Sequence, residues 1–426
     1  MKKIVFTNLV FLLVTMAAAT VFAWPTVYPT GTTFYNPEKA FNGYTLFSMG
    51  HVDPADEKFE SPSIVYLVDM SGNIVHQWTV PFENHHAELQ PNGNIVVICD
   101  DNKVIPERPG EPPFRIGGAQ GWLFEMDWDG NILWEHFDPA MHHDFSTMKN
   151  GNILYLGWEQ VPADLQKKIR GGIKGSEHPG GVMWGTTIIE VNRKGETAWK
   201  WSAIEHWDPK IDIIGPIYNR DEWGHANSVD EMDNGDVVFD AKHTDTVYMV
   251  DKETGKVKWR WGSLSYLDEE TGQIEYKSGG DKDTLGGQHC AHEIPSGLPG
   301  AGNILLYDNG MYADASRAVE VDWKTNEVVW ESPSVGNRHH FSHYISSAER
   351  LANGNTLIDE GAHSRFFEVT EDGELVWEYV ADVPHSFRAH RYAEDYCPQF
   401  KDLPPAKGRA VEAIDVTTFK IPTAAK

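Results

Sequence analysis

A repeated pattern of short turns is the strongest constraint on how this chain folds. Five such turns, each followed by an apolar strand, are PNGN at Pro91, KNGN at Lys149, DNGD at Asp233, GAGN at Gly300 and ANGN at Ala352. Asn-Gly and related pairs favour the tight turns that join two antiparallel strands. Repetition of one unit along a chain predicts a repeat architecture.

Each turn belongs to a unit of four predicted strands. A second strand such as IVVICD or ILLYD follows the turn, and a third strand ends in an acidic or polar turn such as DWDGN or DKETGK. The fourth strand of each unit contains tryptophan, at Trp134, Trp199 and Trp201, Trp259 and Trp261, Trp330, and Trp377. Four-stranded units that recur at about 45–60 residues predict the blades of a β-propeller.

The complete units cover residues 84–137, 141–202, 223–262, 288–332 and 339–380. A further unit lacks its first strand, because GYTLFSMG and SIVYLVDMSGNIVHQW provide only the other three. The segment HSFRAHRYAEDY at 385–396 fits as that missing strand, which would join the two ends of the ring and remove its open edges. We therefore predict an all-β, six-bladed β-propeller closed by a C-terminal strand. Insertions at 103–120, 160–185 and 263–287 are expected to be loops on one face.

The N-terminal 23 residues have the composition of a secretory signal peptide. Two lysines precede an apolar run, and Val21, Phe22 and Ala23 end it at a suitable cleavage site. A retained N-terminal anchor is the alternative, and no later segment reaches the ~20 apolar residues of a membrane span. We expect a signal peptide at 1–23, an N-terminal arm at 24–41, the propeller at 42–400 and a C-terminal tail at 401–426. The protein would be periplasmic or secreted after cleavage near Ala23.

Net charge and cysteine content exclude some partners. The formal charge of −27, with no basic block to offset it, argues against nucleic acid as a partner. An anionic substrate would need a local cationic pocket to overcome this field. Three cysteines, Cys99, Cys290 and Cys397, leave at least one thiol without an intramolecular partner. The sequence does not determine the oligomeric state.

Histidines recur where the first strand of each unit begins. They are His85 and His86, His142 and His143, His225, His289 and His292, and His339, His340 and His343, with His385 and His390 in the closing strand. The first strand of a propeller blade lines the central channel, so equivalent positions converge on one axis. We predict a cluster of imidazoles at one mouth of the channel. The alternative is that these side chains only bond to neighbouring blades.

Such a cluster is suited to two kinds of chemistry. Neutral imidazoles bind transition metals, and carboxylates such as Glu88, Asp144 and Glu293 could orient them. Imidazoles also act as acids, bases and nucleophiles near neutral pH. Arginines near the same mouth would favour an anion over a metal, and the candidates are Arg317, Arg365, Arg388 and Arg391.

Three long motifs resemble the bacterial arylsulfate sulfotransferase family. They are WGHANSVDEMDNGDVVFDAKHTDTVYMVDKETGKVKWRWG, GGQHCAHEIPSGLPGAGNILLYDNG and SSAERLANGNTLIDEG, and the likeness extends over about residues 42–396. The resemblance implies a six-bladed propeller and a periplasmic enzyme that moves a sulfuryl group between phenols without the nucleotide donor PAPS. It also implies ping-pong kinetics with a transiently sulfated histidine, while two further histidines and an arginine hold the sulfuryl oxygens. Small aromatic sulfates and phenols would be its substrates, and no cofactor is expected.

The resemblance assigns roles by motif. His225 in HANSV would be one supporting histidine, and His292, in preference to His289, the other. The sulfated histidine belongs to the last full unit, where His340 and His343 compete. The family's arginine closely follows DNG, but here Arg317 is several residues further on. Either Arg317 reaches the site and acts as the catalytic arginine, or Arg388 or Arg391 replaces it, or the chemistry differs from that of the family. Additional substrate contacts are expected from His86, His143, His289 and Arg388. An aromatic substrate could stack on Trp158, Trp184, Trp207, Tyr218 or Trp223.

Two other functions remain open from the residues alone. One is a metal-dependent oxidoreductase with a transition metal bound by the axial histidines. The other is a propeller that binds a ligand without catalysis, because a fold alone does not establish chemistry.

Overall fold

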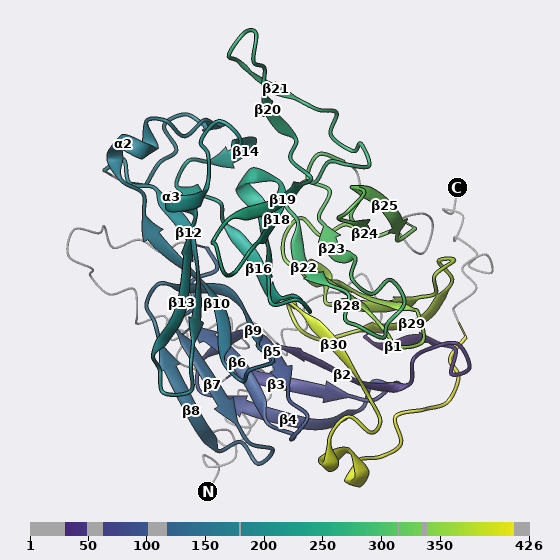
Figure 1. The fold of residues 1–426 in the computed structure, drawn as a ribbon. Coiled ribbons are helices and arrows are strands. Elements are labelled where there is room, and N and C mark those ends of the chain that lie inside the picture. The colour runs from purple at the N-terminus through teal and green to yellow at the C-terminus, as the bar shows by residue number, and fades with distance from the viewer. Residues whose placement is uncertain are drawn as a thin grey trace, which may run out of the picture.

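A computed structural model describes residues 30–48, 63–100, 117–178, 180–313, 315–333 and 339–412. Six small antiparallel sheets are arranged in a ring (Figure 1), which confirms the predicted six-bladed β-propeller. The predicted signal peptide lies outside the described residues. None of the helices in the described part of the chain is long and apolar enough to cross a membrane.

Each blade has four main strands, which follow one another from the channel axis outward. The first contains β30 (Ala389–Ala393), β2 (Gly43–Ser48), β3 (Ser63–Val68) and β4 (Ile74–Val80). The second contains β5 (Glu83–Leu89), β6 (Ile95–Asp100), β7 (Trp122–Met126) and β8 (Ile132–Phe137). The third contains β9 (Met141–Thr147), β10 (Ile153–Gln160), β12 (Trp184–Val191) and β13 (Thr197–Ser202). The fourth contains β16 (Ala226–Glu231), β17 (Val237–Ala241), β18 (Thr246–Val250) and β19 (Val257–Trp261). The fifth contains β22 (His289–Glu293), β23 (Ile304–Asp308), β24 (Arg317–Asp322) and β25 (Glu327–Glu331). The sixth contains β26 (Ser347–Arg350), β27 (Thr356–Glu360), β28 (Arg365–Val369) and β29 (Leu375–Val380).

The C-terminal strand closes the ring, as predicted. β30 pairs antiparallel with β2, where Tyr392 lies opposite Tyr44. Arg391 of this strand forms a buried ion pair at 3.0 Å with Glu368 of the sixth blade. At the outer edge of the sixth blade, β1 (Gly31–Tyr35) pairs with β29. The two ends of the chain therefore join the first and sixth blades.

The repeated turns have a common backbone geometry. The turn glycines are Gly93, Gly151, Gly235, Gly302 and Gly354, and their φ angles lie between +84° and +92°. Residues other than glycine rarely adopt this left-handed region, because their Cβ atom clashes with the backbone. This requirement explains why glycine recurs at the same place in every complete unit.

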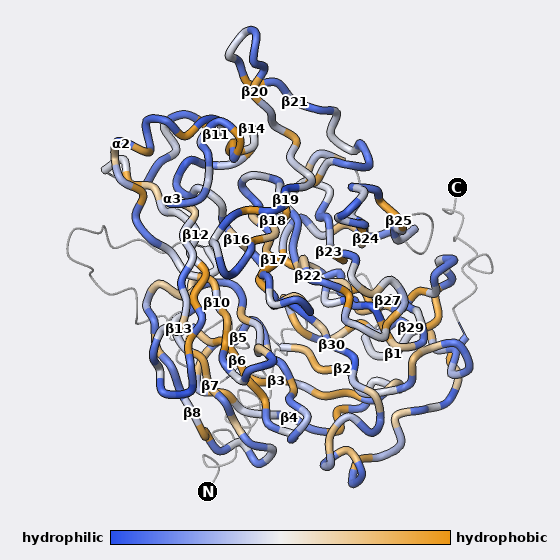
Figure 2. Tube along the Cα trace, in the orientation of Figure 1, coloured by the Kyte–Doolittle hydropathy of each residue, from blue (hydrophilic) through white to orange (hydrophobic). Residues whose placement is uncertain are grey.

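The repeated tryptophans hold each blade to the next. The indole Nε1–H of Trp78 donates to the Asp127 carbonyl at 3.1 Å, in the outer turn of the following blade. Equivalent bonds join Trp134 to Arg193, Trp199 to Lys252, Trp259 to Asn326, Trp330 to Glu371 and Trp377 to Met70. The last of these bonds runs from the sixth blade back to the first. Apolar residues follow the middle strands of the blades (Figure 2), where Val237, Val238 and Phe239 are fully buried.

The remaining elements lie in the insertions and connections. They are α2 (Ala163–Gln166), β11 (Gly171–Ile173), α3 (Ala203–His206), β14 (Ile214–Asn219), β15 (Glu222–Trp223), η1 (Lys242–Thr244), β20 (Ser265–Leu267), β21 (Ile274–Tyr276), η3 (Gly361–His363) and η4 (Pro398–Asp402). The insertion predicted at 263–287 forms the β20–β21 hairpin, and the one at 160–185 contains α2 and β11, which pairs with β14. Most of the insertion at 103–120 lies outside the described residues.

Candidate active site

The inner strands of the blades are interrupted where the histidines occur. His143, His225 and Cys290 have φ angles of +48°, +53° and +61°, which are unusual for residues with a Cβ atom. The pairing of each inner strand with its neighbour shifts register close to these positions. Bulges of this kind bend a strand and re-aim its side chains. They divide the inner-strand residues between two cavities.

The first cavity, of about 280 Å³, contains five of the predicted histidines. Its lining residues are Asn84, His85, Gly117, Gly118, His143, His225, Lys242, His289, Tyr344, Ile345, His385 and Phe387. All six inner strands, or the residues directly before them, contribute. The rings of His143 and His225 lie 4.6 Å apart, edge to face. Radial convergence therefore brings together imidazoles that are far apart in the sequence.

Three of these imidazoles have a pKa below the usual value of a histidine, which favours their neutral form. Burial and then the nearby Lys242 ammonium hold the pKa of His225 well below its usual value. Burial and the surrounding histidines do the same for His143. Burial first, and then Lys242, lower the pKa of His289 to about 3. Neutral rings with available lone pairs are suited to act as bases or nucleophiles.

His225 is oriented by a carboxylate. Its Nδ1 lies 2.6 Å from Oε1 of Glu222, and the other Glu222 oxygen accepts the indole N–H of Trp158 at 2.8 Å. Its ring also stacks on that of His243, with centroids 4.7 Å apart. Since the Nδ1–H donates its hydrogen bond to the carboxylate, the lone pair of the neutral ring lies on Nε2. No described residue forms a hydrogen bond with this Nε2 atom.

Lys242 is a cation that sequence analysis missed. It begins η1, immediately after β17, and its backbone N–H donates to the His225 carbonyl at 3.1 Å. No hydrogen bond or ion pair joins its Nζ to another described residue. Burial lowers the pKa of Lys242, although the charges of Glu222 and Asp245 oppose that shift. A partly buried ammonium that forms no ion pair with another described residue favours binding of an anion.

Phe387 separates the first cavity from a second one. Its ring lies 6.0 to 6.5 Å from the rings of His85, His143 and His289, so it contacts three blades. The guanidinium of the next residue, Arg388, lies 5.4 Å from the centroid of the same ring. Phe387 lines the first cavity and Arg388 lines the second.

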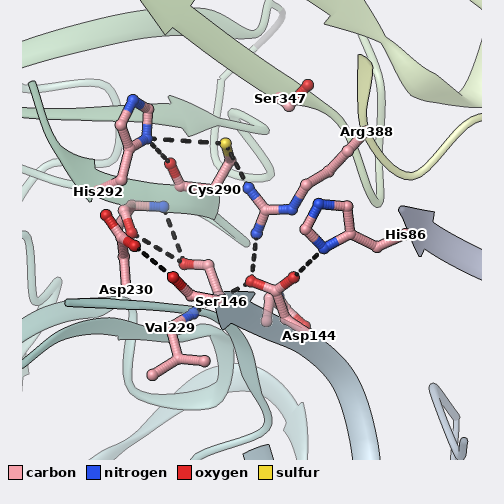
Figure 3. A network of polar contacts seen from close by, with 12 residues as sticks. His86, Asp144, Ser146, Val229, Asp230, Cys290, His292, Ser347 and Arg388 are labelled. Atoms are coloured by element: carbon pink, nitrogen blue, oxygen red, sulfur yellow. Dashed lines mark hydrogen bonds and ion pairs between the residues drawn. The ribbon is translucent and has the colours of Figure 1, made fainter. Parts of the chain in front are cut away.

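The second cavity, of about 200 Å³, lies further along the same inner strands. Its polar lining residues are His86, Glu88, Asp144, Ser146, Asp230, Cys290, His292, Glu293, Ser347, Glu349, Arg350, Arg388 and His390. Asp144 is at the centre of its charge network, because it accepts from Arg388 Nη2 at 2.5 Å and from His86 Nδ1 at 2.8 Å (Figure 3). Burial would raise the pKa of Asp144, but Arg388 and His86 outweigh it and lower that pKa.

The predicted supporting histidines are divided between the two cavities. His225, His143 and His289 line the first, whereas His292, His86 and Arg388 line the second. His292 is therefore not brought together with His225, although His289 is. The reason is the position of His292 near the end of β22, deeper in the channel than His289. The bulge at Cys290 separates the two histidines.

The two candidate nucleophiles of the last blade line neither of these cavities. They precede β26, which begins only at Ser347. His340 is buried against Phe367 and Tyr307, with ring centroids 5.2 and 5.7 Å away. His343 is exposed, and its ring lies 4.6 Å from that of Tyr344, which does line the first cavity.

The candidate arginines are paired with acidic residues. Arg317 binds Asp308 and Glu331, both at 3.0 Å, and lines a third cavity away from the histidines. Arg365 binds Glu360 at 3.0 Å, and Arg391 is paired with Glu368. None of them lines the first cavity, where Lys242 supplies the cation instead.

The aromatic lining of the first cavity also differs from the expectation. None of the predicted stacking residues, Trp158, Trp184, Trp207, Tyr218 and Trp223, lines it. Trp158 instead stacks on the ring of His142, which does not line the cavity either, and the two ring centroids lie 4.3 Å apart. The cavity walls are formed by Phe387 and Tyr344. No motif marks these two residues, since both lie in short irregular segments before an inner strand.

The metal-binding alternative has no matching arrangement within the described residues. No group of three or more His, Cys, Asp or Glu side chains among them has the geometry to hold a metal ion. The alternative stays a prediction that metal analysis of the purified protein tests.

Comparison with known proteins places the chain in a family. Solved structures with similar folds include a protein of unknown function from Bacteroides caccae (14% identity, 82% of this chain, 98% of that one, TM-score 0.47). Another is the periplasmic gluconolactonase of Pseudomonas aeruginosa (11% identity, 82% and 99% coverage, TM-score 0.45). These distant likenesses do not bear on the reaction. No curated protein matches the chain. The arylsulfotransferase (ASST) family model matches residues 45–383, most of the chain, and the protein therefore belongs to the arylsulfotransferase family.

Proposed function

We propose that the first cavity transfers a sulfuryl group from an aryl sulfate to a phenolic acceptor through a sulfated His225. The observation that carries this proposal is the carboxylate-supported imidazole of His225 beside the unpaired ammonium of Lys242 in one cavity. The family membership supports the reaction class. Export of the protein is part of the proposal, on the basis of residues 1–23. N-terminal sequencing of the protein recovered after export tests it, and a start near Trp24 is the expected result.

In the first half of the reaction, Nε2 of His225 attacks the sulfur of the donor. The Nε2–S bond forms as the bond from sulfur to the aryl oxygen breaks, and the phenolate leaves with that electron pair. The imidazole ring then carries a positive charge. Glu222, at 2.6 Å from Nδ1, stabilises this charge and fixes the tautomer that makes Nε2 the nucleophile.

Lys242 supplies the positive charge that the donor requires. Its ammonium would pair with the sulfuryl oxygens and with the developing charge on the phenolate. This is the part that the family resemblance assigned to an arginine. Because Lys242 forms no ion pair within the described part of the chain, it is available for the substrate without breaking one.

In the second half of the reaction, an acceptor phenol takes the group from His225. The Nε2–S bond breaks, a bond from sulfur to the acceptor oxygen forms, and the phenolic proton passes to a neutral imidazole such as His143. Asn84 lines the cavity, and its Oδ1 is buried without a hydrogen-bond partner among the described residues, so it can accept from the acceptor hydroxyl. Phe387 and Tyr344 provide aromatic walls for both rings.

Labelling of the protein by an aryl sulfate that carries radioactive sulfur tests this assignment. The His225→Asn variant is expected to take up no label and to lose turnover by at least about 10³-fold, because its nucleophile is absent. The His343→Asn variant is the matched control, since it removes an exposed histidine outside the cavity, and it should keep both properties. Labelling that survives in His225→Asn but not in His340→Asn or His343→Asn would move the nucleophile to the last blade. Absence of transfer by the wild-type protein with a range of aryl sulfates would reject the reaction itself.

A further inference from the structure

The second cavity contains a cysteine between two cationic groups. Sγ of Cys290 lies 2.6 Å from Nη1 of Arg388 and 3.9 Å from Nδ1 of His292 (Figure 3). Cys290 comes from the same inner strand as His292, whereas Arg388 is contributed by the closing strand region, 98 residues away in sequence. The site is therefore assembled only when the ring closes.

The surroundings favour the thiolate form of Cys290. Burial alone would raise the pKa of its thiol, but Arg388 and His292 outweigh burial and lower it below the usual 9.0. Burial alone would lower the pKa of His292, yet its interactions with Cys290 raise it to about 9. A thiolate beside an imidazolium and a guanidinium is the arrangement of a nucleophilic cysteine.

The other two cysteines provide an internal contrast. Cys99 is fully buried in β6, and burial, followed by the charge of Asp100, raises the pKa of its thiol well above the usual value. Burial also raises the pKa of Cys397. Neither lines any of the cavities described above, whereas Cys290 lines the second. Only Cys290 combines a cationic environment with a cavity.

Two features of the backbone and of Arg388 indicate a site that receives a ligand. Cys290 has a φ angle of +61° at the bulge, a strained conformation that concentrates at functional positions. Arg388 is 7% exposed, and its Nε atom is buried without a hydrogen-bond partner among the described residues. A bound molecule with a hydrogen-bond acceptor would satisfy this donor.

We propose that the second cavity is a covalent binding site in which Sγ of Cys290 attacks a small neutral or cationic electrophile that carries a hydrogen-bond acceptor. A bond forms from sulfur to the electrophilic atom, and the leaving group departs with the electrons of the bond that breaks. The thiolate is the attacking form, and any thiol fraction first loses its proton to solvent. The carboxylates of Glu88, Asp230, Glu293 and Glu349 line the same cavity and disfavour an anionic reagent.

Iodoacetamide is the neutral probe that tests the proposal in the folded full-length protein. Its carbon forms the bond to Sγ, and iodide leaves. After brief exposure near pH 7, peptide mapping by mass spectrometry should show Cys290 modified at least about tenfold faster than Cys99 and Cys397. In denaturant, all three cysteines should react at similar rates. Modification of Cys290 no faster than that of Cys99 in the folded protein would overturn the proposal.

The His292→Gln variant separates activation of the thiolate from simple exposure. It keeps a polar side chain but removes the imidazolium, so the rate at Cys290 should fall severalfold while Cys99 and Cys397 stay protected. Their protection shows that the variant is folded, and an unchanged rate at Cys290 would contradict activation by His292. Iodoacetate, with rates normalised to a free thiol, should react more slowly than iodoacetamide at Cys290. The opposite order would reject the neutral or cationic ligand class.

Discussion

The two cavities on the propeller axis are built from the same six inner strands but carry opposite arrangements of charge. In the first, the pKa values of His143, His225 and His289 are lowered, and the single ammonium, Lys242, forms no ion pair with another described residue. In the second, Asp144, Arg388, His86, Cys290 and His292 are joined in one network. Unpaired groups leave binding energy for a substrate, whereas paired groups stabilise the folded ring. The comparison indicates that one end of the channel is prepared for an anion and the other is held together by its own charges.

The largest expected effect is on stability, and it concerns the second cavity. Asp144→Asn removes the anion that pairs with Arg388 and accepts from His86 and from the backbone N–H of Val229. The free energy of unfolding should fall by about 3–5 kcal/mol, because a buried cation loses its partner. Urea unfolding of the variant measures this. Asp164→Asn, which breaks an exposed pair with Lys167, is the matched control and should change stability little. Equal effects of the two variants would mean that the second cavity is not held by its charges.

Replacement of Lys242 in the first cavity should lower activity but not stability, which is the opposite of the effect of Asp144→Asn. Lys242→Met removes the unpaired ammonium, so kcat/KM for an aryl sulfate should fall by about 10²-fold or more, as for loss of one oxyanion donor. Stability should stay the same or increase, because a buried charge without a partner is removed. Steady-state kinetics and urea unfolding on the same preparation test both parts. A loss of stability like that of Asp144→Asn would show that Lys242 is a structural cation.

The smallest expected effect is a shift in the pH dependence of Cys290 alkylation. Cys290 is faced by Arg388 and His292, which favour its thiolate, and by Asp359, which opposes it, while Asp144 and Asp240 partly offset the Arg388 charge. Since its pKa is lowered from 9.0, the rate of alkylation should stay constant as the pH falls below 9 and decline only below the lowered pKa. At pH 7 the thiolate fraction, and with it the rate, should therefore exceed that of an ordinary thiol with the same intrinsic reactivity. Rates measured from pH 5 to 10 would contradict the prediction if the decline began at 9.

The fold could be predicted from the sequence because its signals are local. A left-handed turn requires glycine at Gly93 or Gly235 whatever surrounds it, and the tryptophan of the fourth strand in each complete unit stands at a constant distance after the turn directly before that strand, as Trp259 does after Gly255. Closure by residues 385–396 followed from a missing strand at the other end of the chain. Each of these inferences depends on one segment and its spacing, so no knowledge of the packed molecule was needed.

The composition of the site could be predicted only in part. Convergence of the histidines follows from the radial repeat, and His143, His225 and His289 do meet in one cavity. The depth of each side chain along the channel cannot be predicted from the repeat, because the bulges at His143, His225 and Cys290 change the register of the inner strands. His340 and His343 share the motif of the other blades, but their segment ends before β26 begins.

The sequence alone determined the number of blades, the closing strand and the type of side chain that gathers on the axis, since these depend on residue pattern and spacing. Tertiary structure decided which imidazoles share a cavity with Lys242, and that Arg388 pairs with Asp144 and Cys290 in the second cavity and not with a substrate in the first. The physical reason is that ion pairs and burial depend on distances between strands that are far apart in the chain. Those distances exist only after the ring has closed.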